Sequence, residues 1–141
     1  MFFFKKVNEA SKLPQSINLS PTYDVFSDEE ITIRPGETRK IKLGFKINIK
    51  DENKRELKDF FIGLYLRESI GSRGLILVNG VGVISLFSDE EISIRVFNTL
   101  EDPQSYENRI VKIKKGEAIA QIAIHKHYGF ELLHAGYRYE K

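Results

Sequence analysis

The sequence has no cysteine, no long hydrophobic run and no large excess of charge of either sign. The lack of cysteine excludes a disulfide framework, a catalytic thiol and a thiolate metal site, and it fits a reducing compartment. The apolar run at residues 1–4 is too short for a signal peptide, and its lysines follow it instead of preceding it. No later stretch approaches the length of a membrane span. We therefore expect a cytoplasmic protein that is not secreted and does not contact a membrane.

The charged residues are balanced and dispersed. The chain has 22 Lys and Arg against 20 Asp and Glu, and the two signs are interspersed along the sequence. The short basic run formed by Lys112, Lys114 and Lys115 is more typical of a solvated strand edge than of a nucleic-acid patch. We expect no nucleic-acid partner.

Apolar residues recur with the period of two that is typical of β-strands. The predicted strands span residues 41–49, 60–66, 75–78, 92–96, 111–113 and 119–124. The charged residues 50–58 predict a loop or a single helical turn, and the Gly/Ser-rich residues 69–74 predict a link. No window has sustained helical periodicity, so the sequence predicts one all-β domain over residues 1–141, a sandwich or barrel of many short strands. Residues 1–19 are expected to form an N-terminal strand or arm.

A nine-residue segment occurs twice. Residues 26–34 read Phe-Ser-Asp-Glu-Glu-Ile-Thr-Ile-Arg, and residues 87–95 repeat them with one Thr/Ser exchange. Each copy predicts an acidic turn that leads into a strand with alternating isoleucines.

Three further segments occur in a recognisable order. Residues 22–27 read Thr-Tyr-Asp-Val-Phe-Ser and precede a Pro-Gly turn, residues 79–85 read Asn-Gly-Val-Gly-Val-Ile-Ser, and residues 116–122 read Gly-Glu-Ala-Ile-Ala-Gln-Ile. Over roughly residues 20–126 they resemble the first, third and fourth motifs of the trimeric deoxyuridine triphosphatases (dUTPases) and their dCTP deaminase relatives. The resemblance implies a compact β-barrel or jelly-roll fold, a homotrimer, and pyrimidine-nucleotide sites between subunits.

The resemblance places the catalytic carboxylate of the third motif at Ser85. That carboxylate activates the attacking water, and a serine hydroxyl has no useful basicity at neutral pH. The Tyr and Arg-Gly that follow in the family are replaced by Ser88, Asp89 and Glu90. Either Asp89, Glu90 or Glu91 serves as a substitute base, or these residues form the solvated turn of a hairpin. We favour the turn. The Glu that serves the deaminase branch as its proton shuttle aligns with Arg95.

The same resemblance implies a set of nucleotide-binding residues, namely Asp24, Arg67, Ser69, Asn79 and Gln121. Arg67 and Ser69 fall in the region of the phosphate-gripping second motif, although Glu68 between them repels a triphosphate unless a cation such as Mg²⁺ intervenes. The amide of Asn79 offers a donor and an acceptor to a pyrimidine edge, but the Asn-Gly pair is equally typical of a turn.

The C-terminal region departs from the family because it lacks the Gly-rich arm that closes over the phosphates. We expect residues 128–141 to pack on a neighbouring subunit, with base stacking by Tyr137 and Tyr139 as the alternative. His125 and His127 have a spacing that metal sites use, but no third ligand is near them in the sequence, so no metal is expected. His134 is expected at the surface or an interface.

The sequence thus predicts a non-catalytic, dUTPase-like homotrimer. Its role would be to bind a pyrimidine nucleotide or to serve as a structural or interaction module with a protein partner, of a kind that phages and viruses encode and that would act in the host cytoplasm. No cofactor is expected, apart from Mg²⁺ if a nucleoside triphosphate is bound. The alternative is an active dUTP pyrophosphatase, which converts dUTP to dUMP and pyrophosphate with a displaced carboxylate.

Overall fold

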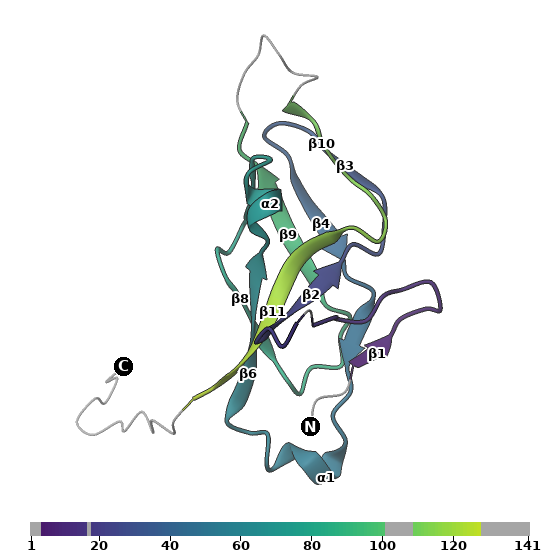
Figure 1. Ribbon diagram of the computed structural model, residues 1–141, viewed down its shortest axis with the longest axis vertical. Helices are drawn as coiled ribbons and strands as arrows, with labels where there is room; N and C mark the ends of the chain where they lie inside the picture. The colour runs from purple at the N-terminus through teal and green to yellow at the C-terminus, as the bar shows by residue number, and fades with distance from the viewer. Residues whose placement is uncertain (1–3, 17, 101–108, 128–141) are drawn as a thin grey trace, which may run out of the picture.

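We describe the protein from a computed structural model, which describes residues 4–16, 18–100 and 109–127 (Figure 1). Short strands dominate the described part of the chain. They are β1 (Phe4–Lys6), β2 (Thr22–Phe26), β3 (Ile31–Ile33), β4 (Thr38–Lys42), β5 (Phe45–Ile47), β6 (Phe60–Leu66), β7 (Leu75–Leu77), β8 (Gly82–Ser85), β9 (Ser93–Asn98), β10 (Val111–Ile113) and β11 (Ala118–Lys126). Two single-turn helices, α1 (Asp51–Lys54) and α2 (Glu68–Gly71), complete the described elements. The predicted all-β fold is confirmed.

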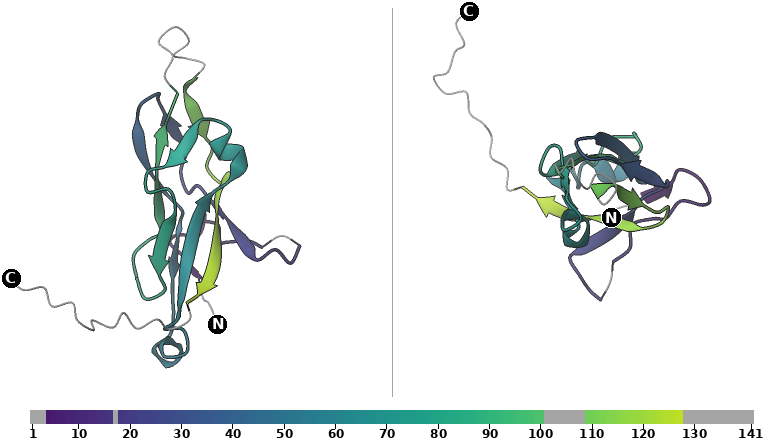
Figure 2. Two further views of the ribbon diagram at one scale, coloured as in Figure 1. Left: turned by 90° about the vertical axis from the view of Figure 1, so that its left-hand side faces the viewer. Right: turned by 90° about the horizontal axis from the view of Figure 1, so that it is seen from above.

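Two larger sheets enclose the core (Figures 1 and 2). One has four strands in the order β2-β11-β6-β8 and the other has three in the order β4-β9-β7, while β1 pairs with β5 and β10 with β3. All the pairings are antiparallel. The inward-facing side chains of both larger sheets form a single buried cluster, with Val25, Ile62 and Ile122 from the first and Ile41, Ile94 and Val96 from the second. This apolar burial is the main source of stability in a chain without disulfides.

The prediction of a single strand over residues 41–49 is wrong in one respect. The alternation holds, because Ile41, Leu43, Phe45 and Ile47 are all buried. However, the segment forms two strands, β4 and β5, which are separated at Leu43 and Gly44. Gly44 has a φ of +76°, a left-handed conformation that only glycine adopts without strain. The chain therefore changes from one sheet to another there, with its buried face unchanged.

Gly44 is also tightly enclosed, which gives a testable prediction. A Cβ at Gly44 would lie 2.6 Å from Asp28 Oδ1 and 2.9 Å from Ser11 Cβ, whereas a Cβ at Gly36, with a similar φ of +75°, would have no atom within 4 Å. Both alanine substitutions incur backbone strain of about 1 kcal/mol, and Gly44→Ala adds a steric clash of about 1–3 kcal/mol. Urea denaturation should show a clearly larger loss of stability for Gly44→Ala than for Gly36→Ala. Equal losses would contradict the close packing at Gly44.

The sequence predicted one of the two helices and missed the other. α1 confirms the helical-turn alternative for residues 50–58. α2 lies where a link was expected, so the prediction for residues 69–74 is wrong for their first part. Ile70, which is 2% exposed, anchors this turn in the core, and a single turn is too short to give periodicity in the sequence. Within the described ranges, no helix is long and apolar enough to cross a membrane.

The two copies of the nine-residue repeat occupy equivalent positions. β2 and β8 are the two edge strands of the four-stranded sheet, and each copy carries the chain from one of these edges into a strand of another sheet, β3 or β9. The prediction of a hairpin at the second copy is wrong, because β8 pairs with β6 whereas β9 pairs with β4 and β7. The segment is a crossover between sheets.

Candidate functional site

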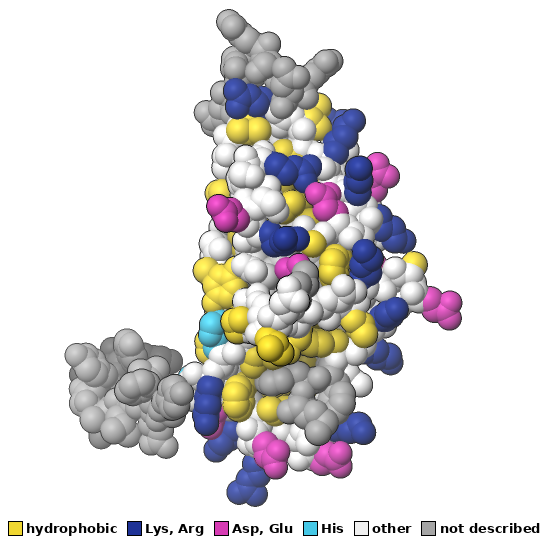
Figure 3. Space-filling view, viewed as in Figure 1, with side chains coloured by type: hydrophobic (Ala, Val, Ile, Leu, Met, Phe, Trp, Pro, Cys, Tyr) yellow, Lys and Arg dark blue, Asp and Glu magenta, His cyan; other side chains and the backbone are white. Residues whose placement is uncertain are grey.

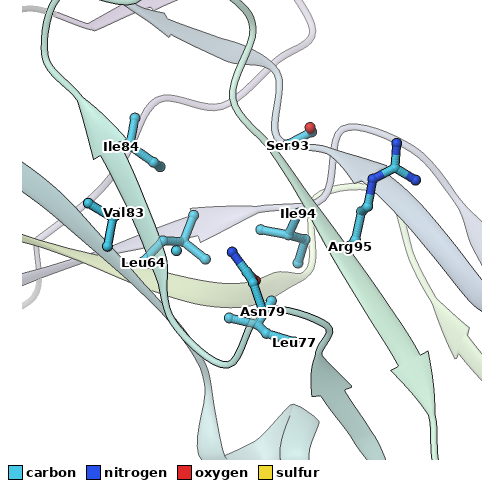
Figure 4. A pocket seen from close by; sticks show the side chains of 9 residues that line it. Leu64, Leu77, Asn79, Val83, Ile84, Ser93, Ile94 and Arg95 are labelled. Atoms are coloured by element: carbon cyan, nitrogen blue, oxygen red, sulfur yellow. The ribbon is translucent and has the colours of Figure 1, made fainter. Parts of the chain in front are cut away.

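Asn79 lines a pocket of about 220 Å³ between β8 and β9 (Figure 4). It lies in a tight turn in which the Gly80 N–H donates to Leu77 O at 3.0 Å and the Val81 N–H to Asn79 O at 2.8 Å, with a φ of +72° at Gly80. The Asn-Gly turn predicted from the sequence is therefore present, and the same turn directs the Asn79 amide into the pocket. The lining residues are Leu64, Leu77, Asn79, Gly82, Val83, Ile84, Ser93, Ile94 and Arg95. A pocket lined by both aliphatic and polar side chains, with one amide directed into it, can hold a flat heterocycle.

Ser85 lies in an adjoining groove of about 350 Å³. The groove shares Val83, Ile84 and Ser93 with the Asn79 pocket and adds Ser85, Ser88, Glu90, Glu91 and Ile92. The Ser85 Oγ accepts a hydrogen bond from the Phe87 N–H at 3.2 Å. Among the described residues, no carboxylate is hydrogen-bonded to this hydroxyl. Chemically, the groove is lined by both hydroxyls and carboxylates.

The three proposed substitute carboxylates do not lie together. Glu91, which is half-buried, and Glu90, which is exposed, both line the groove that contains Ser85. Asp89 instead lines a different hollow, beside Lys54 and Phe87. Glu90 and Glu91 thus share the groove with Ser85, and Glu91 is the less exposed of the two.

A second polar group, formed by Asp24, Arg67 and Gln121, lies on the four-stranded sheet. Arg67 Nη1 lies 3.7 Å from Asp24 Oδ2, and Gln121 is the direct cross-strand neighbour of Asp24. Asp24 is held in register by reciprocal backbone hydrogen bonds to Gln15, at 2.7 and 3.0 Å. Thr22 donates to Gln121 Oε1 at 3.5 Å. A guanidinium, an amide and hydroxyls provide donors for a phosphate.

The two groups share no lining residue within a single chain. Val83 and Ser85, however, lie on the same sheet face as Gln121, because their cross-strand partners Gly63 and Phe61 alternate with Tyr65. Gln121, Asp24 and Tyr65 are cross-strand partners and therefore share one face of the four-stranded sheet. Leu64, which lines the Asn79 pocket, is next to Tyr65 and points to the other face. Of the predicted binding residues, the structure brings Asp24, Arg67 and Gln121 together and leaves Asn79 apart. Ser69 lies exposed in α2, two residues after Arg67.

The histidine pair has structural partners instead of a shared ligand. His125 Nε2 is 2.9 Å from Tyr65 Oη, and its ring stacks on Phe61 with centroids 5.1 Å apart. His127 Nε2 lies 3.8 Å from Asp59 Oδ1. In the described part of the chain, no three His, Asp or Glu side chains gather as a metal site would require. His134, Tyr137, Tyr139 and the tail at residues 128–141 lie outside the described residues.

Two pocket residues were missed as contributors to the site. Ser93 and Arg95 line the Asn79 pocket from β9, and Figure 4 shows the Arg95 guanidinium directed away from Asn79. The alternation in the second repeat copy predicts that Ser93 and Arg95 face away from the core. It does not indicate that the turn containing Asn79 lies next to them. Elsewhere, Figure 3 shows basic and acidic side chains spread along the same face of the molecule.

Comparison with known proteins gives sequence relatives above 30% identity and several structural matches. No family model matches the chain. A deoxyuridine 5'-triphosphate nucleotidohydrolase of Desulfitobacterium hafniense (strain DSM 10664 / DCB-2) is 31% identical over 129 residues, covering 84% of this chain and 73% of that protein.

The structural matches are to phage dUTPases. A point mutant of the dUTPase from phage phi11 of S. aureus, described with a structural Mg(II) ion, has a TM-score of 0.79 at 18% identity and covers 94% of both chains. A point mutant of the Staphylococcus bacteriophage 80alpha dUTPase, with bound dUpNHpp, has a TM-score of 0.80 at 20% identity and covers 100% of this chain and 91% of the other. At these identities the structural matches establish the fold.

Proposed function

The chain belongs to the dUTPase family, and on that basis we propose that it binds a pyrimidine deoxynucleotide without hydrolysing it. The observation that carries the proposal is the pairing of a formed pocket containing Asn79 with a serine at position 85, where the family's motif has its catalytic carboxylate. The pocket supplies recognition, because an amide matches the alternating donors and acceptors of a pyrimidine edge. The hydroxyl of Ser85 cannot take a proton from water at neutral pH, so the chemical step fails.

We expect a complete binding site to be formed by more than one copy of the chain. The phosphate-side residues Asp24, Arg67 and Gln121 form a group that shares no residue with the Asn79 pocket. In a homotrimer, the arrangement that the family resemblance implies, one copy would supply the base pocket and its neighbour the phosphate donors. Light scattering should give a mass of about three times the chain's 16.3 kDa. A mass of one chain would contradict this arrangement.

A nucleoside triphosphate would bring Mg²⁺ with it. Mg²⁺ in such sites is held by one or two carboxylates and by the phosphates themselves. Asp24 is the carboxylate available beside Arg67, so the residues present fit an ion held mostly by the ligand. When bound, the ion would neutralise phosphate charge, which also reduces the repulsion from Glu68.

Nucleotide binding is tested by measuring how nucleotides change the melting temperatures of the unmodified protein and of the variant Asn79→Ala. We expect dUMP and dUTP to raise the melting temperature of the unmodified protein and to have a much smaller effect on Asn79→Ala, because the amide is the base-recognition group. Asn48→Ala, which removes an amide exposed elsewhere on the surface, is the matched control and should behave like the unmodified protein. If no pyrimidine nucleotide shifts the unmodified protein, only the structural or interaction role remains.

An active pyrophosphatase is the second candidate, favoured by the position of Glu91 in the same groove as Ser85. In that case Glu91 would take the proton from the attacking water. The unmodified protein would then release pyrophosphate from dUTP, and Glu91→Gln would abolish the release while Asp89→Asn, outside that groove, would not.

A further inference from the structure

The two repeat copies share a turn and the burial of the isoleucines that follow it. In the first copy the Glu29 N–H donates to Ser27 Oγ at 3.4 Å, and in the second the Glu90 N–H donates to Ser88 Oγ at the same distance. The strand isoleucines that follow each turn are similarly buried, at 5% and 0% exposure for Ile31 and Ile33 and at 6% and 4% for Ile92 and Ile94.

Both copies also bind the same stretch of backbone. The Asp28 N–H donates to Lys42 O at 2.9 Å, while Ile92 exchanges hydrogen bonds with Leu43 and Phe45 at 3.0 Å each. The two copies therefore flank the junction between β4 and β5, although through different positions of the repeat, since Ile31, the counterpart of Ile92, pairs with Ile113. Their shared sequence and shared turn make the surface of the first copy a template for that of the second.

The first copy is covered by residues 8–12, which form a turn in which the Ser11 N–H donates to Asn8 O at 3.1 Å. Lys12 Nζ lies 4.9 Å from the centroid of the Phe26 ring, and Asn8 Nδ2 lies 3.4 Å from Asp28 Oδ2. Ser11, between them, is 2% exposed, as is Ser27 of the repeat itself. A cation over the aromatic ring and an amide on the aspartate are thus the two specific contacts that hold this segment on the repeat.

Within the described residues, the second copy has no such cover. Phe87, which corresponds to Phe26, is 45% exposed, and Asp89, which corresponds to the half-buried Asp28, is exposed. A hollow of about 240 Å³ lies beside both, and its other lining residues are Ile47, Asn48, Ile49, Lys54, Leu86 and Ser88. Lys54 is engaged with Asp51 at 2.7 Å. The negative charges of Asp89 and Glu90 are therefore open to a cationic ligand.

We propose that the second repeat copy is a docking site for a short turn-forming segment of a partner protein. The segment would place a lysine or arginine over the Phe87 ring and an amide or second cation on Asp89, as residues 8–12 do at the first copy. The choice of occupant follows from the charge of the site and from the covered copy. This surface lies in the repeat and its neighbouring hollow, so the proposal does not depend on nucleotide binding.

The chain itself provides the probe. A fluorescein-labelled peptide with the sequence of residues 6–15, Lys-Val-Asn-Glu-Ala-Ser-Lys-Leu-Pro-Gln, is titrated with the full-length protein and followed by anisotropy. We expect saturable binding that weakens by about fivefold or more when the peptide lysine equivalent to Lys12 becomes glutamate, and by a similar factor in protein variants Phe87→Ala and Asp89→Lys. Glu68→Lys, a charge-matched change on α2, should bind the peptide as the unmodified protein does.

Several outcomes would overturn the proposal. These are no binding at millimolar protein, equal binding of both peptides, or equal binding by the Asp89→Lys and unmodified proteins. A fall in mass by light scattering for Phe87→Ala would show that a second copy of the chain covers this surface in place of a partner. Phe87 and Asp89 are exposed, so both variants should fold, and melting curves with circular dichroism check this.

Discussion

Replacing Ser85 with aspartate is expected to raise dUTP hydrolysis by about 10²- to 10⁴-fold, the range associated with a positioned general base. The position lies at the end of β8, where its side chain faces the groove beside the Asn79 pocket. An aspartate there can keep the hydrogen bond from the Phe87 N–H, because Asx turns accept the same donor that Ser85 Oγ accepts now. The substitution therefore adds a carboxylate without disturbing the local backbone. Pyrophosphate release in the presence of Mg²⁺ measures the effect.

Two controls make the Ser85 result specific. Ser85→Asn has nearly the same shape as Ser85→Asp and no charge, so it should stay inactive. Ser88→Asp adds a carboxylate to the same groove at a position that the motif does not use, and it should also stay inactive. A Ser85→Asp protein that binds dUTP but shows no gain in turnover would contradict the view that the missing carboxylate is what prevents hydrolysis.

Removing the side chain of Asn98 is expected to destabilise the fold by about 3–5 kcal/mol, since each buried polar group left unpaired costs about 1–3 kcal/mol. Asn98 is fully buried at the end of β9. Its Nδ2 donates to Ile33 O at 3.0 Å and to Arg109 O at 2.8 Å, and its Oδ1 accepts the Leu100 N–H at 3.1 Å. One amide thus ties β9 to β3 and to the segment that leads into β10.

Urea denaturation of Asn98→Ala measures this loss, as a lower midpoint with an unchanged slope. Asn48→Ala is the matched control, because Asn48 is exposed, and its change should be within about 0.5 kcal/mol. Similar midpoints for the two variants would show that the Asn98 network contributes little.

The local structure of this chain was largely predictable because period-two alternation is a local signal. β6 and β10 have the predicted bounds, and the buried residues of β4 and β5 are the predicted ones. The break at Gly44 was not predicted, since it depends on Asp28 and Ser11, which approach from distant parts of the chain. The crossover at the second repeat was missed for the same reason, because strand pairing between β8 and β6 or between β9 and β4 is set by tertiary packing.

The sequence predicted individual residues of the candidate site but not how they are arranged in space. The motifs pointed to Asn79, Arg67 and Gln121, and the first lines a pocket while the other two gather around Asp24. Their separation into two groups could not be inferred, because it depends on strand order and tertiary packing. The presence of Ser93 and Arg95 in the pocket depends on how β9 passes the Asn79 turn, which the sequence does not encode locally.

The central claim, binding without hydrolysis, is tested most directly by ³¹P NMR of dUTP mixed with an equal amount of protein and Mg²⁺. We predict that all three phosphate resonances persist and are shifted or broadened by the protein, and that Asn79→Ala removes this effect. The appearance of dUMP and pyrophosphate at a rate above that of a protein-free sample would contradict the claim, as would resonances identical to those of free dUTP.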